Sequence, residues 1–318
     1  MKVLVTGGRG YVGGRLCHFL ADDPEFEVFS GSRSASAEAS QGDRISAVTT
    51  DWDSMESLVA CCAGMDAVVH LAAINAADSK HDPVAALEVN GVGTACLIQA
   101  ATQSGVRRFV YISTAHVYGL PLVGTLNEKT CPLPVHPYAT SHRAAEDVVC
   151  AASFQGLIEG VVLRLSNGFG APTLAEADCW DLLFNDLCRQ VVVSGAMVLR
   201  SSGMQRRDFI AMADVCRAIR HSLQLPAVSL SDRIFNLGGQ WSPTILEAAV
   251  LVADRFEARG RVRPPITMEI AAHGERSEPL DYRIDLLRGT GFVPSMDAIA
   301  EIDGLIDFCE KTFGSCRG

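Results

Sequence analysis

The segment HPYATSHRAAE, residues 136–146, places a phenol and an imidazole four positions apart. On a helix that begins near Tyr138, residues four positions apart lie on one face, so His142 would lie one turn below Tyr138. A positioned phenol can move the proton of a sugar or alcohol hydroxyl while a hydride leaves or reaches the carbon. The pair is therefore a candidate for proton transfer, although two ordinary surface residues would show the same spacing.

A hydroxyl partner for this phenol is predicted at the end of the strand-like run RRFVYIST, which closes with Ser113 and Thr114. Open α/β sheets keep their chemistry at the carboxyl edge of the strands. If the helix of Tyr138 crosses that edge, the phenol lies beside these hydroxyls. The candidate catalytic residues are Tyr138, Thr114, His142 and Ser113.

A glycine cluster near the N-terminus, VTGGRGYVGGRL, lies between a strand-like run and a helix. Small residues let the backbone approach a pyrophosphate, and a helix N-terminus supplies N–H groups and partial positive charge. A tight turn alone would need similar glycines, but the strand, the helix and their order together favour a dinucleotide. The candidate cofactor contacts in this turn are Gly7, Arg9, Gly10, Tyr11, Val12 and Gly13.

The end of the second strand bears on the choice between NAD and NADP. An Asp or Glu about 20 residues after the glycines usually binds the ribose hydroxyls of NAD, whereas this chain has Ser32 and Arg33 there. A hydroxyl and a guanidinium, with Arg9 as a second cation, suit a 2′-phosphate, so NADP is slightly favoured over NAD. The alternative is that these arginines are simply solvated.

The end of the third strand adds two further candidates for the cofactor site, Asp51 and its neighbour Trp52. A carboxylate at Asp51 could accept a hydrogen bond from an adenine amino group. It could equally be the N-cap of the next helix.

Strand-like and helical stretches alternate through the first half of the chain, with strands at KVLVT, FEVFS, ISAVTT, DAVVHLAA, RRFVYIST and GVVLRLS. Strands that are apolar at nearly every position are typical of a parallel sheet covered on both faces. We expect an α/β fold, a Rossmann-type doubly wound parallel sheet with a smaller C-terminal substrate-binding lobe. The expected NAD(P)-binding domain is 1–168, with about 205–240 returning to it, and the lobe is 169–318, with helices at 174–191, 213–224, 243–258 and 297–312.

Bulk properties narrow the possible partners. A net charge of −10 argues against nucleic acid. Eleven cysteines without a Cys-x-x-Cys spacing predict reduced thiols, and no metal-site spacing is evident. Because there is no signal-peptide pattern and no apolar run near the ~20 residues that span a bilayer, we expect a cytoplasmic protein without a membrane partner.

These motifs together resemble the extended short-chain dehydrogenase/reductase superfamily, close to the nucleotide-sugar epimerases, dehydratases and 4-keto reductases. The matching motifs cover roughly residues 1–240: TGGRGYVG, HLAA at 70–73, VNGVGT with Asn90, YISTAHVYG at 111–119, Tyr138, RLSNGFGAP at 164–172 and RRDFIAMADV at 206–215. The motifs are specific for the superfamily and not for one substrate.

The resemblance implies roles for individual residues. Thr114 matches the catalytic Ser/Thr and Tyr138 the acid/base tyrosine. The residues implied to line the cofactor site are Leu71, Ala72, Ala73 and Asn90. The residues implied to contact the diphosphate or nucleotide of the substrate are Asn167, Arg207 and Arg276. The resemblance also implies a homodimer, formed through helices near 84–104 and 138–154.

The chain departs from the superfamily at His142, because the pattern there is Tyr-x-x-x-Lys. That lysine holds the nicotinamide ribose and lowers the tyrosine pKa, and two charges ~4 Å apart at an effective dielectric of ~20 interact by ~4 kcal/mol, or about three pKa units. Three outcomes stay open: a protonated His142 replaces the lysine at lowered pH, the charge of the oxidised nicotinamide suffices, or the protein binds cofactor with little or no turnover.

A second departure concerns the reaction. Dehydratases of the superfamily follow the catalytic Thr with Asp and Glu, where this chain has Ala115 and His116, so a 4,6-dehydratase is not favoured. His116 is either a second acid/base toward the substrate or a hydrogen-bonded structural residue.

The sequence therefore predicts an NAD(P)-dependent epimerase or 4-keto reductase that acts on a nucleotide sugar. One alternative is a reductase of a non-nucleotide ketone, which would not need Arg207 and Arg276. Another is a catalytically impaired NAD(P)-binding regulatory or scaffold protein, as the exchange at His142 allows.

Overall fold

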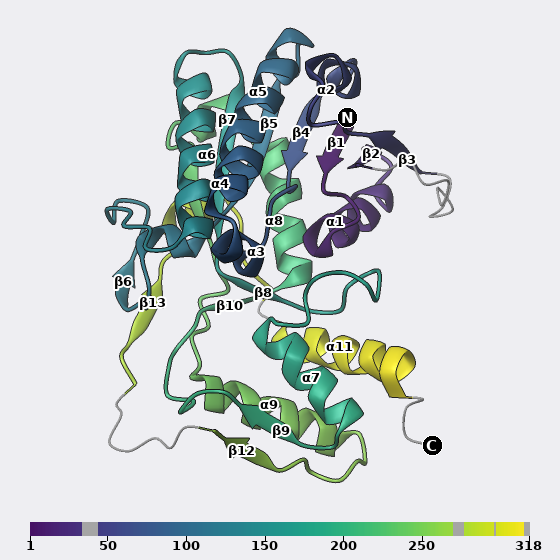
Figure 1. The fold of residues 1–318 in the computed structure, drawn as a ribbon, viewed down its shortest axis with the longest axis vertical. Helices are drawn as coiled ribbons and strands as arrows, with labels where there is room; N and C mark the ends of the chain where they lie inside the picture. Colours follow the sequence, from purple (N-terminus) through teal and green to yellow (C-terminus); the bar gives the residue numbers. More distant parts are fainter. Residues whose placement is uncertain (34–43, 270–276, 296, 315–318) are drawn as a thin grey trace.

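A seven-stranded parallel sheet forms the centre of the computed structural model, which describes residues 1–33, 44–269, 277–295 and 297–314 (Figure 1). The strand order is β11-β7-β5-β4-β1-β2-β3. This order reverses between β1 and β4, where doubly wound sheets bind ligands. The expected doubly wound parallel sheet is confirmed, with strands β1 (Lys2–Thr6), β2 (Glu27–Ser32), β3 (Ile45–Thr49), β4 (Ala67–His70), β5 (Arg108–Thr114), β7 (Glu159–Leu165) and β11 (Ile234–Leu237).

Helices cover both faces of this sheet (Figure 1). On one face α1 (Tyr11–Ala21) and α8 (Met212–Gln224) pack apolar side chains against Val3 and Val5 of β1. On the other face α2 (Met55–Cys62), α5 (Gly93–Gln103) and α6 (Pro137–Phe154) pack against Leu4 of β1 and against Phe109 and Tyr111 of β5. All seven residues of β5 are buried, which explains the nearly continuous apolar strands of the sequence.

The helical stretch before β5 changes its winding at the position of Asn90. It follows α3 (Ala76–His81) and comprises α4 (Pro83–Ala86), the π-helical turn η1 (Leu87–Val92) and α5. By length and composition alone, Pro83–Gln103 could cross a bilayer, contrary to the sequence expectation. However, 44% of its most apolar 18-residue window is buried inside the molecule, and the stretch packs against α2 and α6, as core helices do.

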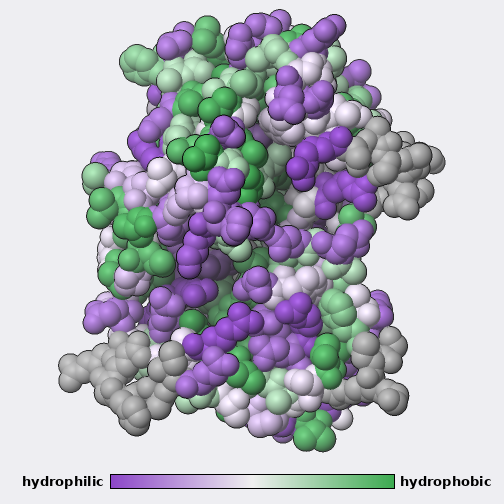
Figure 2. All heavy atoms as spheres, viewed as in Figure 1, coloured by the Kyte–Doolittle hydropathy of each residue, from purple (hydrophilic) through white to green (hydrophobic). Residues whose placement is uncertain are grey.

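A smaller lobe follows the sheet in the lower half of Figure 1. Its core joins α7 (Leu183–Val193), α9 (Ile245–Ala258) and α11 (Ala298–Phe313) to the strand pair β9 (Met197–Leu199) and β12 (Ile266–Met268). Figure 2 shows hydrophilic residues gathered along the middle of this face, where the two parts meet. The remaining elements are η2 (Ala115–Tyr118), β6 (Gly124–Leu126), β8 (Asn167–Phe169), β10 (Phe209–Ala211), η3 (Ala227–Leu230), β13 (Leu280–Tyr282) and α10 (Asp285–Gly289).

One expected helix is wrong in its extent. The helix predicted over 174–191 begins only at Leu183, because long-range contacts hold the residues before it. The Trp180 ring packs on Phe308 and Phe313 of α11, and Asp178 accepts a hydrogen bond from Asn75. The strand β11 lies within 205–240 and joins the edge of the sheet, while the division into two domains stays a prediction.

Candidate functional site

The turn between β1 and α1 has the shape that a dinucleotide needs. Gly7 has φ +69°, and a Cβ there would lie 2.9 Å from the backbone nitrogen of Ala72. A Cβ on Gly13 would overlap the carbonyl oxygen of Gly7. Among the described residues no side chain caps α1 at Gly10. The N–H groups of the first turn therefore suit phosphate oxygens, and the turn fits the predicted cofactor.

The other residues of this turn face different surroundings. The Tyr11 hydroxyl donates to the carbonyl oxygen of Gly170 at 2.9 Å, and burial raises the pKa of Tyr11 well above its usual value. The Tyr11 side chain thus joins the turn to the segment after β8. The predicted contact of Tyr11 with the cofactor would therefore be made by its backbone. Val12 packs against the core, and Arg9 is exposed.

The end of β4 lies directly against the glycine turn. The Thr6 hydroxyl oxygen accepts hydrogen bonds from the backbone nitrogens of Leu71 and Ala72, at 3.2 and 3.3 Å. It also lies 2.7 Å from Nδ1 of His70, and Ala73 next along the chain is exposed. The three residues predicted to line the cofactor site therefore follow β4 beside Gly7.

Asn90 connects this segment to α6. Its Oδ1 accepts from the backbone nitrogen of Ile74 at 2.8 Å, and its Nδ2 donates to the Ser141 hydroxyl at 2.9 Å. π-Helical turns are frequent at functional sites, and here the turn orients the buried Asn90 side chain between the two elements. Asn90 thus holds the start of α6 next to the end of β4.

At the end of β2, Ser32 is half-buried and Arg33 is exposed, and their assignment to a 2′-phosphate stays a prediction. The neighbouring Asp51 is not the N-cap of α2, because Ser54 accepts the capping bond from the Ser57 nitrogen at 3.2 Å. Asp51 instead accepts from the Asp53 nitrogen at 3.1 Å. The N-cap alternative for Asp51 is therefore wrong.

The Trp52 ring packs on His70 at the end of β4, with ring centroids 5.6 Å apart. It also packs against the apolar cluster beneath α2 and α5. The structure gives Trp52 a packing role, and its assignment to the cofactor site stays a prediction.

Tyr138 lies in the first turn of α6, at the carboxyl edge of β5. A hydrogen-bonding interaction with the Thr114 side chain partly offsets the effect of burial, which raises the Tyr138 pKa to about 12. The Thr114 oxygen also accepts from the His116 backbone nitrogen at 3.2 Å. The structure therefore brings the predicted phenol and its hydroxyl partner together, with the phenol protonated at neutral pH.

His142 lies one turn below Tyr138, with ring centroids 4.4 Å apart. Burial, with smaller contributions from His116 and His136, lowers the His142 pKa to about 3. Burial therefore favours the neutral form of His142 over a protonated replacement for the lysine near neutral pH. Its Nδ1 lies 2.7 Å from the Tyr111 hydroxyl, and its buried Nε2 has no hydrogen-bond partner among the described residues, which fits a site for a ligand oxygen.

His116 and His136 form a pair beside Tyr138. Their ring centroids are 5.5 Å apart, and the His136 ring stacks on that of Tyr138 at 6.1 Å. Burial, with smaller effects of His136 and Arg207, lowers the His116 pKa to about 4. The buried Nδ1 of His116 has no hydrogen-bond partner in the described chain, which disfavours the structural interpretation of this residue. His136 was not among the site residues predicted from the sequence. The His136 Nδ1 accepts a hydrogen bond from the Ala139 nitrogen and caps α6.

Two of the predicted diphosphate contacts lie at the short parallel pair β8 and β10, in which Asn167 is opposite Phe209. The Asn167 amide donates to the carbonyl oxygen of Asp208 at 2.8 Å, and Arg207 donates to Gln205 at 3.3 Å. Burial lowers the Arg207 pKa. Asn167 therefore begins β8 and Arg207 lies two residues before β10, whereas Arg276 is outside the described residues.

Ser113 does not join the proton-transfer group. Side chains alternate between the two faces of a strand, and the Ser113 hydroxyl donates to Glu146 at 2.6 Å. Glu146 also accepts from Arg164. The structure thus corrects the catalytic assignment of Ser113, which belongs to a buried ionic network.

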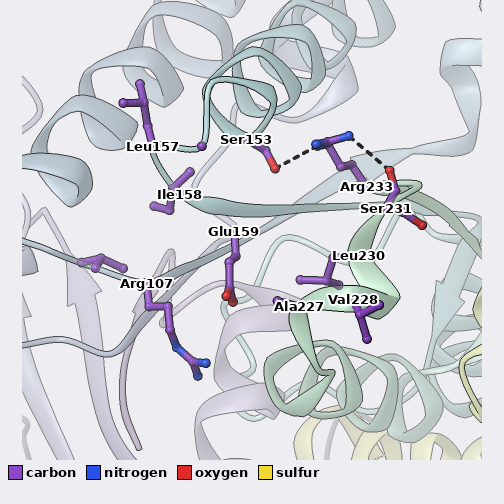
Figure 3. Close-up of a pocket in the computed structure, with 12 residues that line it drawn as sticks. Arg107, Ser153, Leu157, Ile158, Glu159, Ala227, Val228, Leu230, Ser231 and Arg233 are labelled. Carbon is purple, nitrogen blue, oxygen red and sulfur yellow. Dashed lines mark hydrogen bonds between the residues drawn. The ribbon is translucent and has the colours of Figure 1, made fainter.

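A hollow of about 480 Å³ lies at the opposite edge of the sheet (Figure 3). Its walls include Arg107 and Glu159, at the start of β5 and β7, and the hydrogen-bonded pair Ser153 and Arg233. Because Thr114 lies at the other end of β5, this hollow is not positioned for the chemistry of Tyr138.

The fold and the site define a dinucleotide-dependent enzyme of the short-chain dehydrogenase type. The model of the NAD dependent epimerase/dehydratase family matches residues 3–238, and the chain belongs to this family.

One curated relative aligns with most of the chain, and another aligns with about half of it. It is 28% identical over 315 residues to a dTDP-glucose 4,6-dehydratase of Actinoplanes sp., covering 93% of this chain and 94% of that protein. It is 33% identical over 177 residues to a UDP-glucose 4-epimerase of Rhizobium leguminosarum bv. trifolii, covering 53% and 52%. The fold is similar to that of UDP-glucuronic acid 4-epimerase from Bacillus cereus in complex with UDP-glucuronic acid and NAD, with a TM-score of 0.81, 21% identity and coverage of 98% and 99%.

Proposed function

We propose that this protein is an NAD(P)-dependent enzyme that acts on a nucleotide sugar, as an epimerase or a 4-keto reductase. The observation that carries the proposal is the position of Tyr138 in the first turn of α6, next to Thr114 at the carboxyl edge of β5. The names of its relatives, UDP-glucose 4-epimerase and dTDP-glucose 4,6-dehydratase, support a nucleotide-linked sugar as the substrate class.

Each protein group has one task in this reaction. A dinucleotide held at the glycine turn would supply or accept a hydride at the sugar C4. The Tyr138 hydroxyl gives its proton to the C4 oxygen during reduction and takes it back during oxidation, while Thr114 orients that oxygen. Asn167 and Arg207 bind the diphosphate, and the proposal includes Arg276 in the same role.

Two observations favour a reductase over an epimerase, and one favours the reverse. The protonated Tyr138, with a pKa of about 12, is ready to donate, and Ser32 with Arg33 suits the phosphate of NADP. The family name, NAD dependent epimerase/dehydratase, points to an epimerase and to NAD. The proposal therefore keeps both reactions and both cofactors.

We infer that the protein is located in the cytoplasm and forms a homodimer. The ten described cysteines are free, as in reducing compartments. Val84, Leu87, Val89 and Val92 expose large apolar side chains on the helices expected to pair. Light scattering of the purified protein tests the dimer.

Native mass spectrometry of the purified protein, followed by assays with NADH, NADPH and UDP-, dTDP-, GDP- and CDP-sugars, tests the function. Retained NAD with C4 inversion supports an epimerase, and NADPH-dependent reduction of a 4-keto sugar supports a reductase. Arg207→Ala is expected to raise KM for the nucleotide sugar. Unchanged KM together with turnover of a simple ketone would instead support the non-nucleotide reductase, and tight cofactor binding without any turnover would support the regulatory alternative.

A further inference from the structure

The pair of Tyr111 and His142 joins the central sheet to the helix that carries Tyr138. Tyr111 lies in the middle of β5, and its hydroxyl is 2.7 Å from Nδ1 of His142. Both side chains are buried, with exposed fractions of 2% and 3%. Water therefore does not reach either group freely. The surrounding protein alone decides which of the two groups donates the hydrogen bond.

The hydrogen-bond partners decide which atom carries the imidazole proton. Burial raises the Tyr111 pKa well above its usual value, so the phenol keeps its proton. Within the described ranges, that hydroxyl has one hydrogen-bond partner, His142 Nδ1. A buried O–H has to donate to an acceptor, so Nδ1 is the acceptor. Because the neutral imidazole has one proton, that proton lies on Nε2.

The Nε2–H of His142 is then a donor in need of an acceptor. It is buried and lacks a hydrogen-bond partner among the described residues. Its ring packs edge-on against Tyr138, with centroids 4.4 Å apart. Asn90, which bonds Ser141 next to it, holds the same turn of α6 against the segment that follows β4. The donor thus belongs to the wall that carries the proton-transfer phenol.

We propose that Tyr111 is a positioning residue that fixes His142 as the Nε2–H tautomer, so that His142 donates a neutral hydrogen bond to a hydroxyl oxygen of the bound dinucleotide. This inference rests on the proposed function. A neutral donor binds an oxygen without repelling the positive charge of an oxidised nicotinamide, as a buried cation would. It also leaves the acidity of Tyr138 unassisted by a neighbouring charge.

The tautomer is tested directly by NMR of the full chain labelled with ¹⁵N-histidine, because the two ring nitrogens of a neutral imidazole have distinct shifts. The His142 signals are assigned by their loss in His142→Gln. We expect a protonated Nε2 and an unprotonated Nδ1 in the wild type, and a mixture of tautomers in Tyr111→Phe. A proton on Nδ1 in the wild type would overturn the proposal. This readout needs no turnover, so it is independent of the proposed function.

The consequence for binding is tested by calorimetry with NAD and NADP. Tyr111→Phe should weaken the preferred dinucleotide by about three- to tenfold, in line with one lost neutral hydrogen bond. Combining it with His142→Gln should add nothing to the effect of His142→Gln alone. Tyr282→Phe, which removes another buried hydroxyl that bonds Arg164 and Asn236, controls for general loss of packing. Additive losses, or equal weakening in the control, would contradict the role of Tyr111. Absence of dinucleotide binding by the wild type would instead contradict the proposed function.

Discussion

Arg164 of β7 donates from Nε and Nη2 to the two carboxylate oxygens of Glu146 in α6, at 2.9 and 2.7 Å. The two side chains have exposed fractions of 1% and 0%. Ser113 of β5 donates to the same carboxylate. The helix that presents Tyr138 is thus fixed to β7 by a buried bidentate ion pair and to β5 by a hydrogen bond, and the position of the phenol depends on both.

Glu146→Leu should lower the free energy of unfolding by about 3–5 kcal/mol, because it leaves the Arg164 guanidinium buried without its carboxylate. Urea denaturation monitored by circular dichroism measures this change. Asp254→Leu removes a carboxylate from an exposed pair with Arg263 and should have a far smaller effect. Similar losses in the two variants would show that burial of the pair is not what matters.

Tyr138→Phe should reduce turnover by about 10²–10⁴-fold, the usual contribution of a positioned proton donor. The affinity for the dinucleotide should change little, because the variant removes only the hydroxyl. Thr114→Val should lower turnover less, since it removes the group that orients the phenol and the substrate oxygen. Turnover within tenfold of the wild type in Tyr138→Phe would assign proton transfer to another group, with His116 the first to examine.

The folded protein should lose stability as the pH falls, in part because of His142. Its pKa is about 3 in the folded state and ~6.5 when unfolded. Below about pH 6.5 only the unfolded chain binds this proton, so the contribution is fully present above that pH and falls by about 2 kcal/mol by pH 5. His142→Gln should reduce the difference in unfolding free energy between pH 7 and pH 5 by that amount, and His81→Gln, at an exposed position, is the control. An unchanged difference in His142→Gln would mean that His142 is protonated in the folded protein.

His142→Lys should return a positive charge to the turn below Tyr138. A cation ~4 Å away at an effective dielectric of ~20 favours the phenolate by ~4 kcal/mol, or about three pKa units. The rise in the rate of sugar oxidation with pH should therefore move to lower pH by up to about three units, relative to both the wild type and His142→Gln. If the pH–rate profile keeps its position, the residue at 142 does not influence the acidity of Tyr138.

Local patterns made the sheet and the glycine turn predictable from the sequence. The residue types of a β-branched run, or a glycine at a left-handed position such as Gly7, favour the observed backbone conformation without any distant contact. The contacts of Ser113 and Thr114 were not predictable, because β5 is buried on both faces and no alternation marks which side each residue takes. Residues 174–182 have helix-forming composition, yet the packing of Trp180 on α11 overrides it. The low pKa of His142 depends likewise on burial by distant elements.

Ser32→Asp should shift the cofactor preference from NADP toward NAD. Ser32 ends β2, at the position from which a carboxylate can accept hydrogen bonds from ribose hydroxyls and repel a 2′-phosphate. We expect the ratio of the two dissociation constants, measured by calorimetry, to change by at least about tenfold, since a neutral hydrogen bond to the phosphate is exchanged for a charge repulsion. Ser46→Asp adds the same charge to an exposed position of β3 and should leave the ratio unchanged. If Ser32→Asp also leaves it unchanged, the adenosine ribose is bound elsewhere, and the preference inferred from Ser32 and Arg33 has to be abandoned.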